Sequence, residues 1–289
     1  NLMSLQEKFG KLEAHLKSLV VGQERLLNRM LVALLSDGHL LVEGAPGLAK
    51  TRAIKVLSHS IEGDFHRLQF TPDLLPADLV GTRMFNQRSS EFSTVLGPVF
   101  ANLLLADEIN RATPKTQSAL LEVMEEHQVT ADGETYPLPE PFFVVGTQNP
   151  TSHIGTFPLP ESQLDRFLMR ISLGFPGQAL ERELLRGNDR REMIAETAPV
   201  LKTEQLLALQ KLVPGVHVSP ALLDYLQALV LHTLQERGAK ISQIIAEIYS
   251  LVEAGQGERE VGVYKSPAGG GLRPRRVAVR HGPPTWQRH

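Results

Sequence analysis

The stretch that decides the fold is His39-Leu40-Leu41-Val42-Glu43-Gly44-Ala45-Pro46-Gly47-Leu48-Ala49-Lys50-Thr51. Its apolar first half is typical of a buried parallel strand, and its glycine-containing second half leads into a helical pattern over residues 50–61. A glycine-rich loop between a strand and a helix wraps phosphate groups with backbone N–H groups at the positive end of the helix. The stretch therefore predicts a nucleotide-phosphate loop within an α/β fold.

The residues of this loop have candidate roles in binding ATP. We expect Lys50 to reach the β- and γ-phosphates and the hydroxyl of Thr51 to ligate Mg²⁺. The general pattern asks for glycine before the lysine, but Ala49 is small and tolerates helical dihedrals, so phosphate binding should persist. The candidate cofactor-binding residues of this segment are Gly44, Ala45, Pro46, Gly47, Leu48, Ala49, Lys50, Thr51 and Arg52.

A second strand-like run, Leu103-Leu104-Leu105-Ala106, ends in the carboxylates Asp107 and Glu108. Ligands bind at the carboxyl ends of the strands in open α/β sheets. We expect Asp107 to hold Mg²⁺ through its water shell and Glu108 to polarise the attacking water. Thr51 and Asp107 are thus the predicted metal-binding residues.

Two further segments offer a neutral polar group and a cation. Asn149 follows the apolar run 142–147, and its amide can fix a water molecule against the γ-phosphate, although asparagine before proline is more often a turn. Arg166 precedes the run 167–173 and could act on a neighbouring subunit's nucleotide, although a lone arginine there usually forms a surface ion pair. The predicted catalytic residues are Lys50, Glu108, Asn149 and Arg166.

Strand-like runs alternate with helical patterns, which predicts a parallel sheet with helices on both faces. Two helices are expected within residues 5–35, with a break at 20–23, and further helices at 50–61 and 113–127. The segments 85–99 and 129–138 interrupt the alternation and are predicted as hairpins. The five expected strands span residues 39–43, 66–71, 102–106, 142–147 and 167–173.

After Pro176 the pattern becomes helical, with helices expected at 181–186, 203–212 and 219–234 and one more possible at 241–252. We predict a nucleotide-binding core at 1–177, a smaller helical lid at 178–252 and a divergent basic tail at 253–289. The tail is rich in glycine and proline and has no acidic residue after Glu260. This composition indicates either a segment that meets nucleic acid or an acidic partner, or a poorly ordered terminus, which we favour.

The composition favours a cytoplasmic enzyme. In 289 residues, 42% are hydrophobic and 21% charged, and the net charge of −2 provides no basic field that would attract nucleic acid. Cysteine is absent, which excludes disulfides and thiolate metal sites. No apolar run approaches the ~18 residues that a membrane span needs. The first residues show no signal-peptide pattern.

Together these segments resemble the MoxR family of AAA+ ATPases, from about residue 20 to residue 234. The most specific marks are Gly47-Leu48-Ala49-Lys50-Thr51, Phe70-Thr71-Pro72-Asp73-Leu74-Leu75-Pro76-Ala77-Asp78-Leu79-Val80-Gly81, Gly97-Pro98-Val99-Phe100, Asp107-Glu108-Ile109-Asn110-Arg111-Ala112, Thr147-Gln148-Asn149-Pro150, Leu159-Pro160-Glu161 and Leu164-Asp165-Arg166-Phe167. The resemblance implies a P-loop NTPase (AAA+) core with a parallel five-stranded sheet, followed by a helical lid. It also implies Asn149 as sensor 1, Arg166 as arginine finger with Arg170 as the weaker candidate, and adenine contacts at Val21 and Gly22.

The same resemblance implies a function and an assembly. Such proteins use ATP and Mg²⁺ in hexameric rings, remodel or mature partner complexes in a chaperone-like way, and commonly work with a protein carrying a von Willebrand factor A domain. They place hairpin insertions near the pore or face of the ring. The alternatives are a nucleic-acid motor of the helicase-related AAA+ branches, a nucleotide-dependent scaffold with little turnover, and a metal-chelatase motor subunit.

The lid departs from the family pattern. The family's sensor 2 arginine lies in a motif followed by two amphipathic helices, whereas here its nearest counterpart, Gly271-Leu272-Arg273-Pro274-Arg275-Arg276, follows a run of glycines. Arg275 is therefore the sensor 2 candidate in a lid that does not follow the complete pattern.

Overall fold

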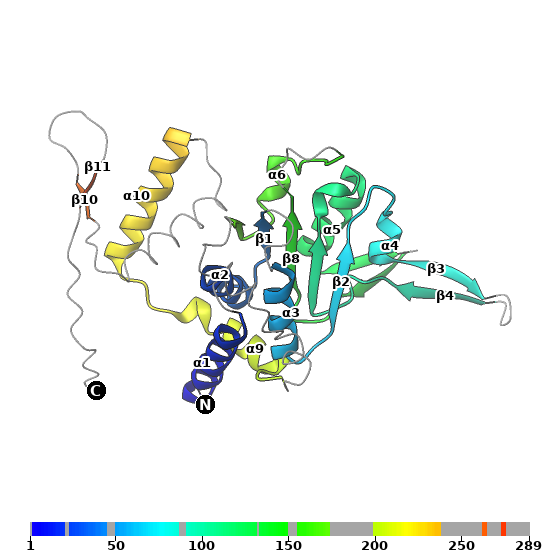
Figure 1. Ribbon diagram of the computed structural model, residues 1–289, viewed down its shortest axis with the longest axis horizontal. Coiled ribbons are helices and arrows are strands. Elements are labelled where there is room, and N and C mark those ends of the chain that lie inside the picture. Colours follow the sequence, from blue (N-terminus) through cyan, green and yellow to red (C-terminus); the bar gives the residue numbers. More distant parts are fainter. Residues whose placement is uncertain are drawn as a thin grey trace, which may run out of the picture.

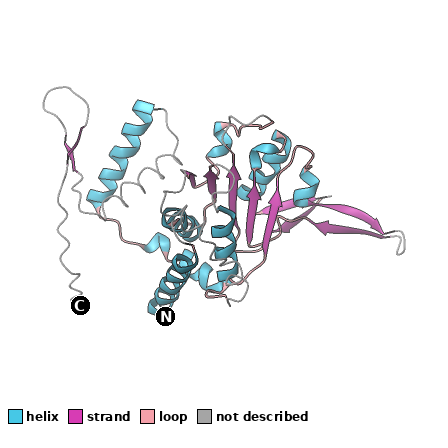
Figure 2. Cartoon of the chain, viewed as in Figure 1, coloured by secondary structure: helices cyan, strands magenta, loops and turns pink. Residues whose placement is uncertain are grey.

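The protein is built around a five-stranded parallel sheet (Figure 1; Figure 2). The structure is a computed structural model, and it describes residues 2–20, 23–44, 50–86, 91–131, 133–149, 155–173, 199–237, 262–264 and 273–275. The strand order is β2-β5-β8-β1-β9, and every neighbouring pair is parallel. The strands are β1 (Leu40–Glu43), β2 (Phe65–Gln69), β5 (Leu103–Asp107), β8 (Phe143–Gln148) and β9 (Met169–Ser172). All five predicted strands are confirmed, and so is the α/β fold.

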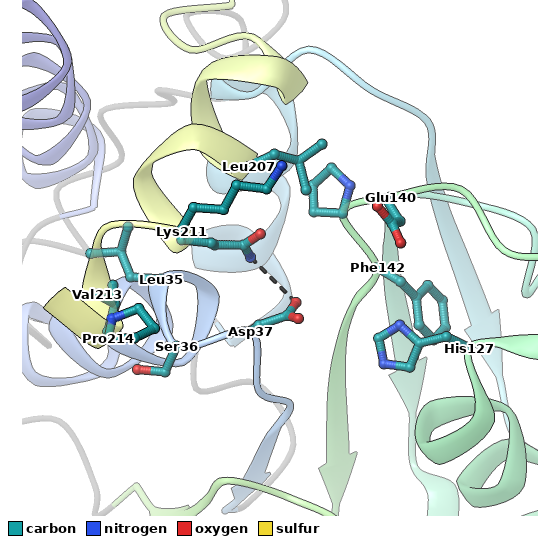
Figure 3. A pocket seen from close by; sticks show the side chains of 12 residues that line it. Leu35, Ser36, Asp37, His127, Glu140, Phe142, Leu207, Lys211, Val213 and Pro214 are labelled. Carbon is teal, nitrogen blue, oxygen red and sulfur yellow. Dashed lines mark hydrogen bonds between the residues drawn. The ribbon is translucent and has the colours of Figure 1, made fainter. Parts of the chain in front are cut away.

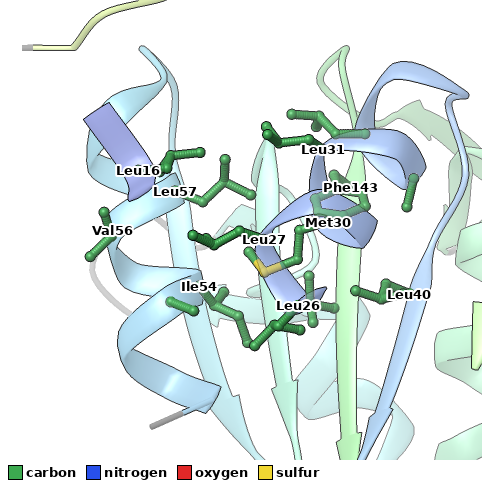
Figure 4. Packing of buried hydrophobic residues seen from close by; sticks show 14 of the residues in the cluster. Leu16, Leu26, Leu27, Met30, Leu31, Leu40, Ile54, Val56, Leu57 and Phe143 are labelled. Carbon is green, nitrogen blue, oxygen red and sulfur yellow. The ribbon is translucent and has the colours of Figure 1, made fainter. Parts of the chain in front are cut away.

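Successive side chains of the strands alternate between two hydrophobic clusters, one on each face of the sheet. Leu40 and Val42 of β1 belong to the cluster that packs under α1 (Leu2–Leu19), α2 (Glu24–Leu35) and α3 (Lys50–Ser60), part of which Figure 4 shows. Leu41 belongs to the other cluster, which α4 (Pro76–Val80), α5 (Pro114–Glu126) and α6 (Glu161–Leu164) help to cover. The sheet is therefore buried on both faces, as its continuous apolar runs predicted.

The two hairpins are also confirmed. β3 (Gly81–Asn86) pairs with β4 (Glu91–Leu96), and this hairpin projects away from the sheet (Figure 1). Its strands span residues 81–96, whereas the sequence indicated the segment 85–99. At its base the two backbones approach closely at Gly81 and Gly97, where a Cβ atom would meet backbone atoms of the facing segment. Gly81 has a φ of +105°, a backbone conformation that would be strained in a residue with a side chain. The second hairpin joins β6 (Gln128–Ala131) and β7 (Glu134–Pro137).

Beyond the sheet the structure describes the 3₁₀ turns η1 (Ile109–Arg111) and η2 (Val213–Gly215) and the helices α9 (Thr203–Gln210) and α10 (Pro220–Arg237). The two helices confirm the predictions at 203–212 and 219–234, and those at 181–186 and 241–252 lie outside the described residues. Leu206 and Leu209 of α9 join the cluster under α1–α3, and the Gln210 amide donates to the Leu34 carbonyl at 2.7 Å. α9 thus packs on the core, and the division at residues 177 and 178 stays a prediction.

Two short strands lie within the predicted tail. β10 (Gly262–Tyr264) and β11 (Arg273–Arg275) pair in antiparallel fashion, which the composition of the tail did not predict.

Within the described residues, no single helix combines the length and apolar character needed to cross a membrane. The bent pair Thr203–Gly215 and Pro220–Leu231 meets both criteria jointly, by length and composition only.

Candidate active site

The candidate site lies at the carboxyl edge of the sheet, where β5, β8 and β1 end side by side. Gly44 directly follows β1 at this edge, and its N–H donates to the Gln148 carbonyl at 3.4 Å. Thr51 and Arg52 follow in the first turn of α3, so the strand, loop and helix order predicted for a phosphate loop is present. Residues 45–49, Val21 and Gly22 lie outside the described part of the chain, as do the side chains of Lys50 and Arg275.

Asp107 is held by two donors from neighbouring strands. Its Oδ1 accepts a hydrogen bond from the hydroxyl of Thr147 at 2.5 Å, and its Oδ2 accepts one from Nη2 of Arg67 at 2.6 Å. Thr147 lies on β8 and Arg67 on β2, so both strands that flank β5 orient this carboxylate. Sequence reasoning missed both partners, because neither residue is adjacent to Asp107 in the chain.

Glu108 leaves the strand in an unusual backbone conformation. Its φ of 56° and ψ of 48° are left-handed, which is uncommon for a residue other than glycine and costs free energy that the surroundings must offset. The Glu108 N–H donates to the Thr147 hydroxyl at 2.9 Å, and its carboxylate pairs with Arg111 at 3.1 Å. Such strain is typical of functional sites. The structure thus places the two predicted carboxylates together at the end of β5, where Thr147 of the neighbouring strand β8 contacts both residues.

Asn149 is fixed at the end of β8 by a second asparagine. The Asn110 amide donates to the Asn149 carbonyl at 3.0 Å, and Oδ1 of Asn110 accepts from the Asn149 N–H at 3.4 Å. Asn110 is completely buried and comes two residues after Glu108. It therefore ties the segment after β5 to the end of β8. The sequence signal for Asn110 was its place in the segment Asp107-Glu108-Ile109-Asn110-Arg111-Ala112, but its contact with Asn149 joins residues 39 positions apart and does not follow from that segment.

Arg166 and Arg170 are both engaged within the chain. Nη1 of Arg166 donates to the Leu121 carbonyl of α5 at 3.1 Å and also forms an ion pair with Glu125. Arg170, the weaker arginine-finger candidate, lies on β9 and pairs with Glu43 of β1 at 2.7 Å. The structure places Arg166 outside the strand, just before β9. Its action on a neighbouring subunit stays a prediction.

The opposite edge of the sheet holds a buried histidine and a small cavity. Burial lowers the pKa of His39 to about 4, a shift that a hydrogen bond to the Met124 carbonyl opposes and His127 reinforces. The ring accepts from the Val144 N–H at 3.1 Å, so the neutral form fits this position. A cavity of about 330 Å³ lies nearby, lined by His127, Phe142 and residues of α9 among others (Figure 3). Neither feature belongs to the carboxyl edge.

Comparisons with known proteins match this chain to a family of ATPases. Residues 39–169 match the family described as "ATPase family associated with various cellular activities (AAA)". The chain is 50% identical to chaperone MoxR1 of Mycobacterium tuberculosis over 221 residues, which cover 75% of this chain and 57% of that protein. It is 32% identical to protein MoxR of Paracoccus denitrificans over 237 residues, 78% of this chain and 69% of that protein.

A solved structure is similar as well. The crystal structure of a candidate ATPase from Cytophaga hutchinsonii superposes with a TM-score of 0.72 at 42% sequence identity, covering 80% of this chain and 70% of that one. The chain nevertheless spans little more than half the length of chaperone MoxR1.

Proposed function

The chain belongs to the MoxR family of AAA+ ATPases, and from this premise we propose that it hydrolyses ATP with Mg²⁺ to remodel or mature a partner protein complex. The observation that supports hydrolysis best is the junction of β5 and β8. There one hydroxyl, that of Thr147, contacts both the Asp107 carboxylate and the Glu108 N–H beside the strand that leads into the phosphate loop.

The residues present fit Mg²⁺ and a nucleotide. Mg²⁺ prefers oxygen ligands and is usually bound by one or two protein groups together with substrate phosphates, and Thr51 and Asp107 supply a hydroxyl and a carboxylate. Nε of Arg52 is buried without a hydrogen-bond partner among the described residues, which leaves a donor beside the start of α3 for a bound group. When bound, Mg²⁺ would neutralise charge on the transferred phosphoryl group.

The remaining steps belong to residues of the chain. The Glu108 carboxylate, held by Arg111, would orient a water molecule for attack, and Asn149 at the end of the neighbouring strand would fix the same water. Lys50 would bind the β- and γ-phosphates. Arg166 would stabilise charge on the nucleotide of an adjacent subunit, so we propose that the active form is a homo-oligomeric ring, most simply a hexamer.

The chaperone-like purpose is proposed from the names of the relatives, of which MoxR1 is called a chaperone. We propose a protein partner, with a von Willebrand factor A domain as the leading candidate. Its capture should require bound ATP, because a ligand shifts a protein towards the conformation that it binds better, and we propose that the ATP-bound conformation is the one that holds the client.

The test uses Glu108→Gln, which keeps the shape of the side chain and removes the charge that orients water. Wild-type protein should hydrolyse ATP only with Mg²⁺, and the variant should bind a fluorescent ATP analogue while turnover falls about a hundredfold or more. The variant loaded with ATP should retain specific protein partners in a pull-down, and the same variant without ATP is the matched control. Normal turnover by Glu108→Gln would remove this residue from the mechanism, and ATPase activity stimulated by nucleic acid would favour the nucleic-acid motor.

A further inference from the structure

Three neighbouring strands meet at one carboxylate. Glu43 is the last residue of β1 and lies opposite Gln148 of β8 and Ser172 of β9 in the register of the sheet. The Gln148 amide and the Arg170 guanidinium both donate to Oε1 of Glu43, the guanidinium at 2.7 Å. The Glu43 carboxylate therefore joins the ends of β8, β1 and β9 directly before the chain enters the phosphate loop.

These three side chains, the Glu43 cluster, lie on one face of the sheet. Arg170 is opposite Leu41 in the register, and Leu41 belongs to the hydrophobic cluster covered by α5. Since side chains alternate along a strand, Glu43 faces the same side as Leu41. The side chain of Gln148 is buried, and those of Glu43 and Arg170 are only 21% and 31% exposed. Solvent therefore screens this ion pair less than it screens a surface pair.

The charge of Glu43 is unfavourable for the proposed binding of ATP unless it is compensated. A carboxylate one residue before Gly44 adds negative potential at the start of a loop that has to hold phosphates. Arg170 supplies the opposite charge at 2.7 Å, and Gln148 supplies a second donor to the same oxygen. Gln148 also precedes Asn149, so the cluster connects the start of the loop to the candidate sensor.

We propose that Arg170 promotes nucleotide binding in its own subunit by neutralising Glu43 at the start of the phosphate loop. This inference rests on the proposed binding of ATP. It assigns Arg170 a role different from that of an arginine finger, which acts on the nucleotide of a neighbour. Loss of a finger removes hydrolysis and spares binding, whereas loss of Arg170 should weaken binding within the subunit itself.

The experiment is an equilibrium titration of the full chain with a fluorescent ATP analogue and Mg²⁺. Arg170→Ala should weaken binding about tenfold, because it leaves the Glu43 charge uncompensated. Glu43→Gln combined with Arg170→Ala should recover most of the lost affinity, since the charge that opposed the phosphates is then gone. Arg170→Lys, which keeps the charge, should stay close to the wild type. The deficit of Arg170→Ala should also shrink as salt is raised, because screening weakens its electrostatic cause.

The rescue by Glu43→Gln separates this role from a merely structural one, since a damaged sheet edge would not recover when a second contact residue is removed. Wild-type affinity in Arg170→Ala would overturn the inference, and so would a double variant that binds as weakly as Arg170→Ala. If wild-type protein does not bind the analogue, the proposed function itself fails, and this inference fails with it. Thermal melting checks the fold of each variant, and Arg170→Gln carries the same expectation if Arg170→Ala does not fold.

Discussion

The hydroxyl of Thr147 donates to Oδ1 of Asp107 at 2.5 Å and accepts the N–H of Glu108 at 2.9 Å. One buried side chain on β8 thus orients the candidate metal ligand and fixes the backbone of the candidate catalytic carboxylate, both at the end of β5. Hydrogen bonds to a charged group are stronger than those between neutral groups, and a buried partner left alone is costly. Thr147 therefore couples the stability of this edge to the geometry of the site.

We predict that Thr147→Val lowers both stability and turnover. The change keeps the shape of the side chain but leaves two groups without their partner, so the free energy of unfolding should fall by about 1–3 kcal/mol. Turnover should fall further than stability alone explains, because Asp107 and Glu108 lose their common anchor. Denaturant titration and ATPase assays measure the two effects, and Thr147→Ser, which retains the hydroxyl, is the control. Equal behaviour of the Val and Ser variants would contradict the anchoring role.

Lys50→Ala should abolish nucleotide binding, because the lysine is the residue expected to bring a cation to the β- and γ-phosphates. Lys55→Ala is the matched control, since Lys55 lies on the same helix and is exposed. Binding of a fluorescent ATP analogue measures the difference. Micromolar affinity surviving in Lys50→Ala would show that this loop does not hold the phosphates.

Arg166→Ala should bind ATP and lose about 10³-fold in turnover, because an arginine finger contributes to the site of a neighbour. Mixing Arg166→Ala with Lys50→Ala subunits should restore part of the activity, since one interface then contains an intact loop and an intact finger. Specific activity of the wild type should likewise rise with protein concentration.

Glu125→Ala is the control for the local contact of Arg166. It removes the ion-pair partner while keeping the arginine, and an exposed pair of this kind contributes little to stability. Turnover should therefore remain close to that of the wild type. Failure of the mixed subunits to regain activity, together with concentration-independent turnover, would contradict the shared interface.

His39 should make the protein less stable in mild acid. Its pKa is about 4 in the folded protein against an ordinary value of 6.5, so the unfolded chain takes up a proton first as the pH falls. The contribution of neutral His39 is fully present above pH 6.5 and is lost progressively towards pH 4. The shift corresponds to about 3 kcal/mol across that window.

The measurement is the free energy of unfolding as a function of pH. His39→Asn should flatten the slope between pH 6.5 and 4, because the amide oxygen can accept the Val144 N–H without titrating. His217→Gln is the comparison, since it removes an exposed histidine. An unchanged slope in His39→Asn would show that another group causes the acid sensitivity.

Much of this fold follows from local sequence. The apolar runs that end at Glu43, Asp107 and Gln148 produce strands buried on both faces, and alternation with helical patterns makes the sheet parallel. The glycine after the first of these runs and the two carboxylates at the end of the second mark the carboxyl edge of the sheet as the candidate ligand-binding edge. The strand-to-helix order around the loop, the adjacency of Asp107 and Glu108 and the positions of both hairpins could therefore be predicted. These features depend on residues that are close together in the chain.

The contacts that orient the site depend instead on the order of the strands. Asp107 meets Arg67 and Thr147 because β5 is inserted between β2 and β8, and Glu43 meets Arg170 because β9 lies beside β1. Periodicity marks each strand without specifying its neighbours, since any apolar strand can occupy the middle of a parallel sheet. The tertiary packing selects one order, and that order brings together side chains that are about 40 to more than 100 positions apart in the sequence.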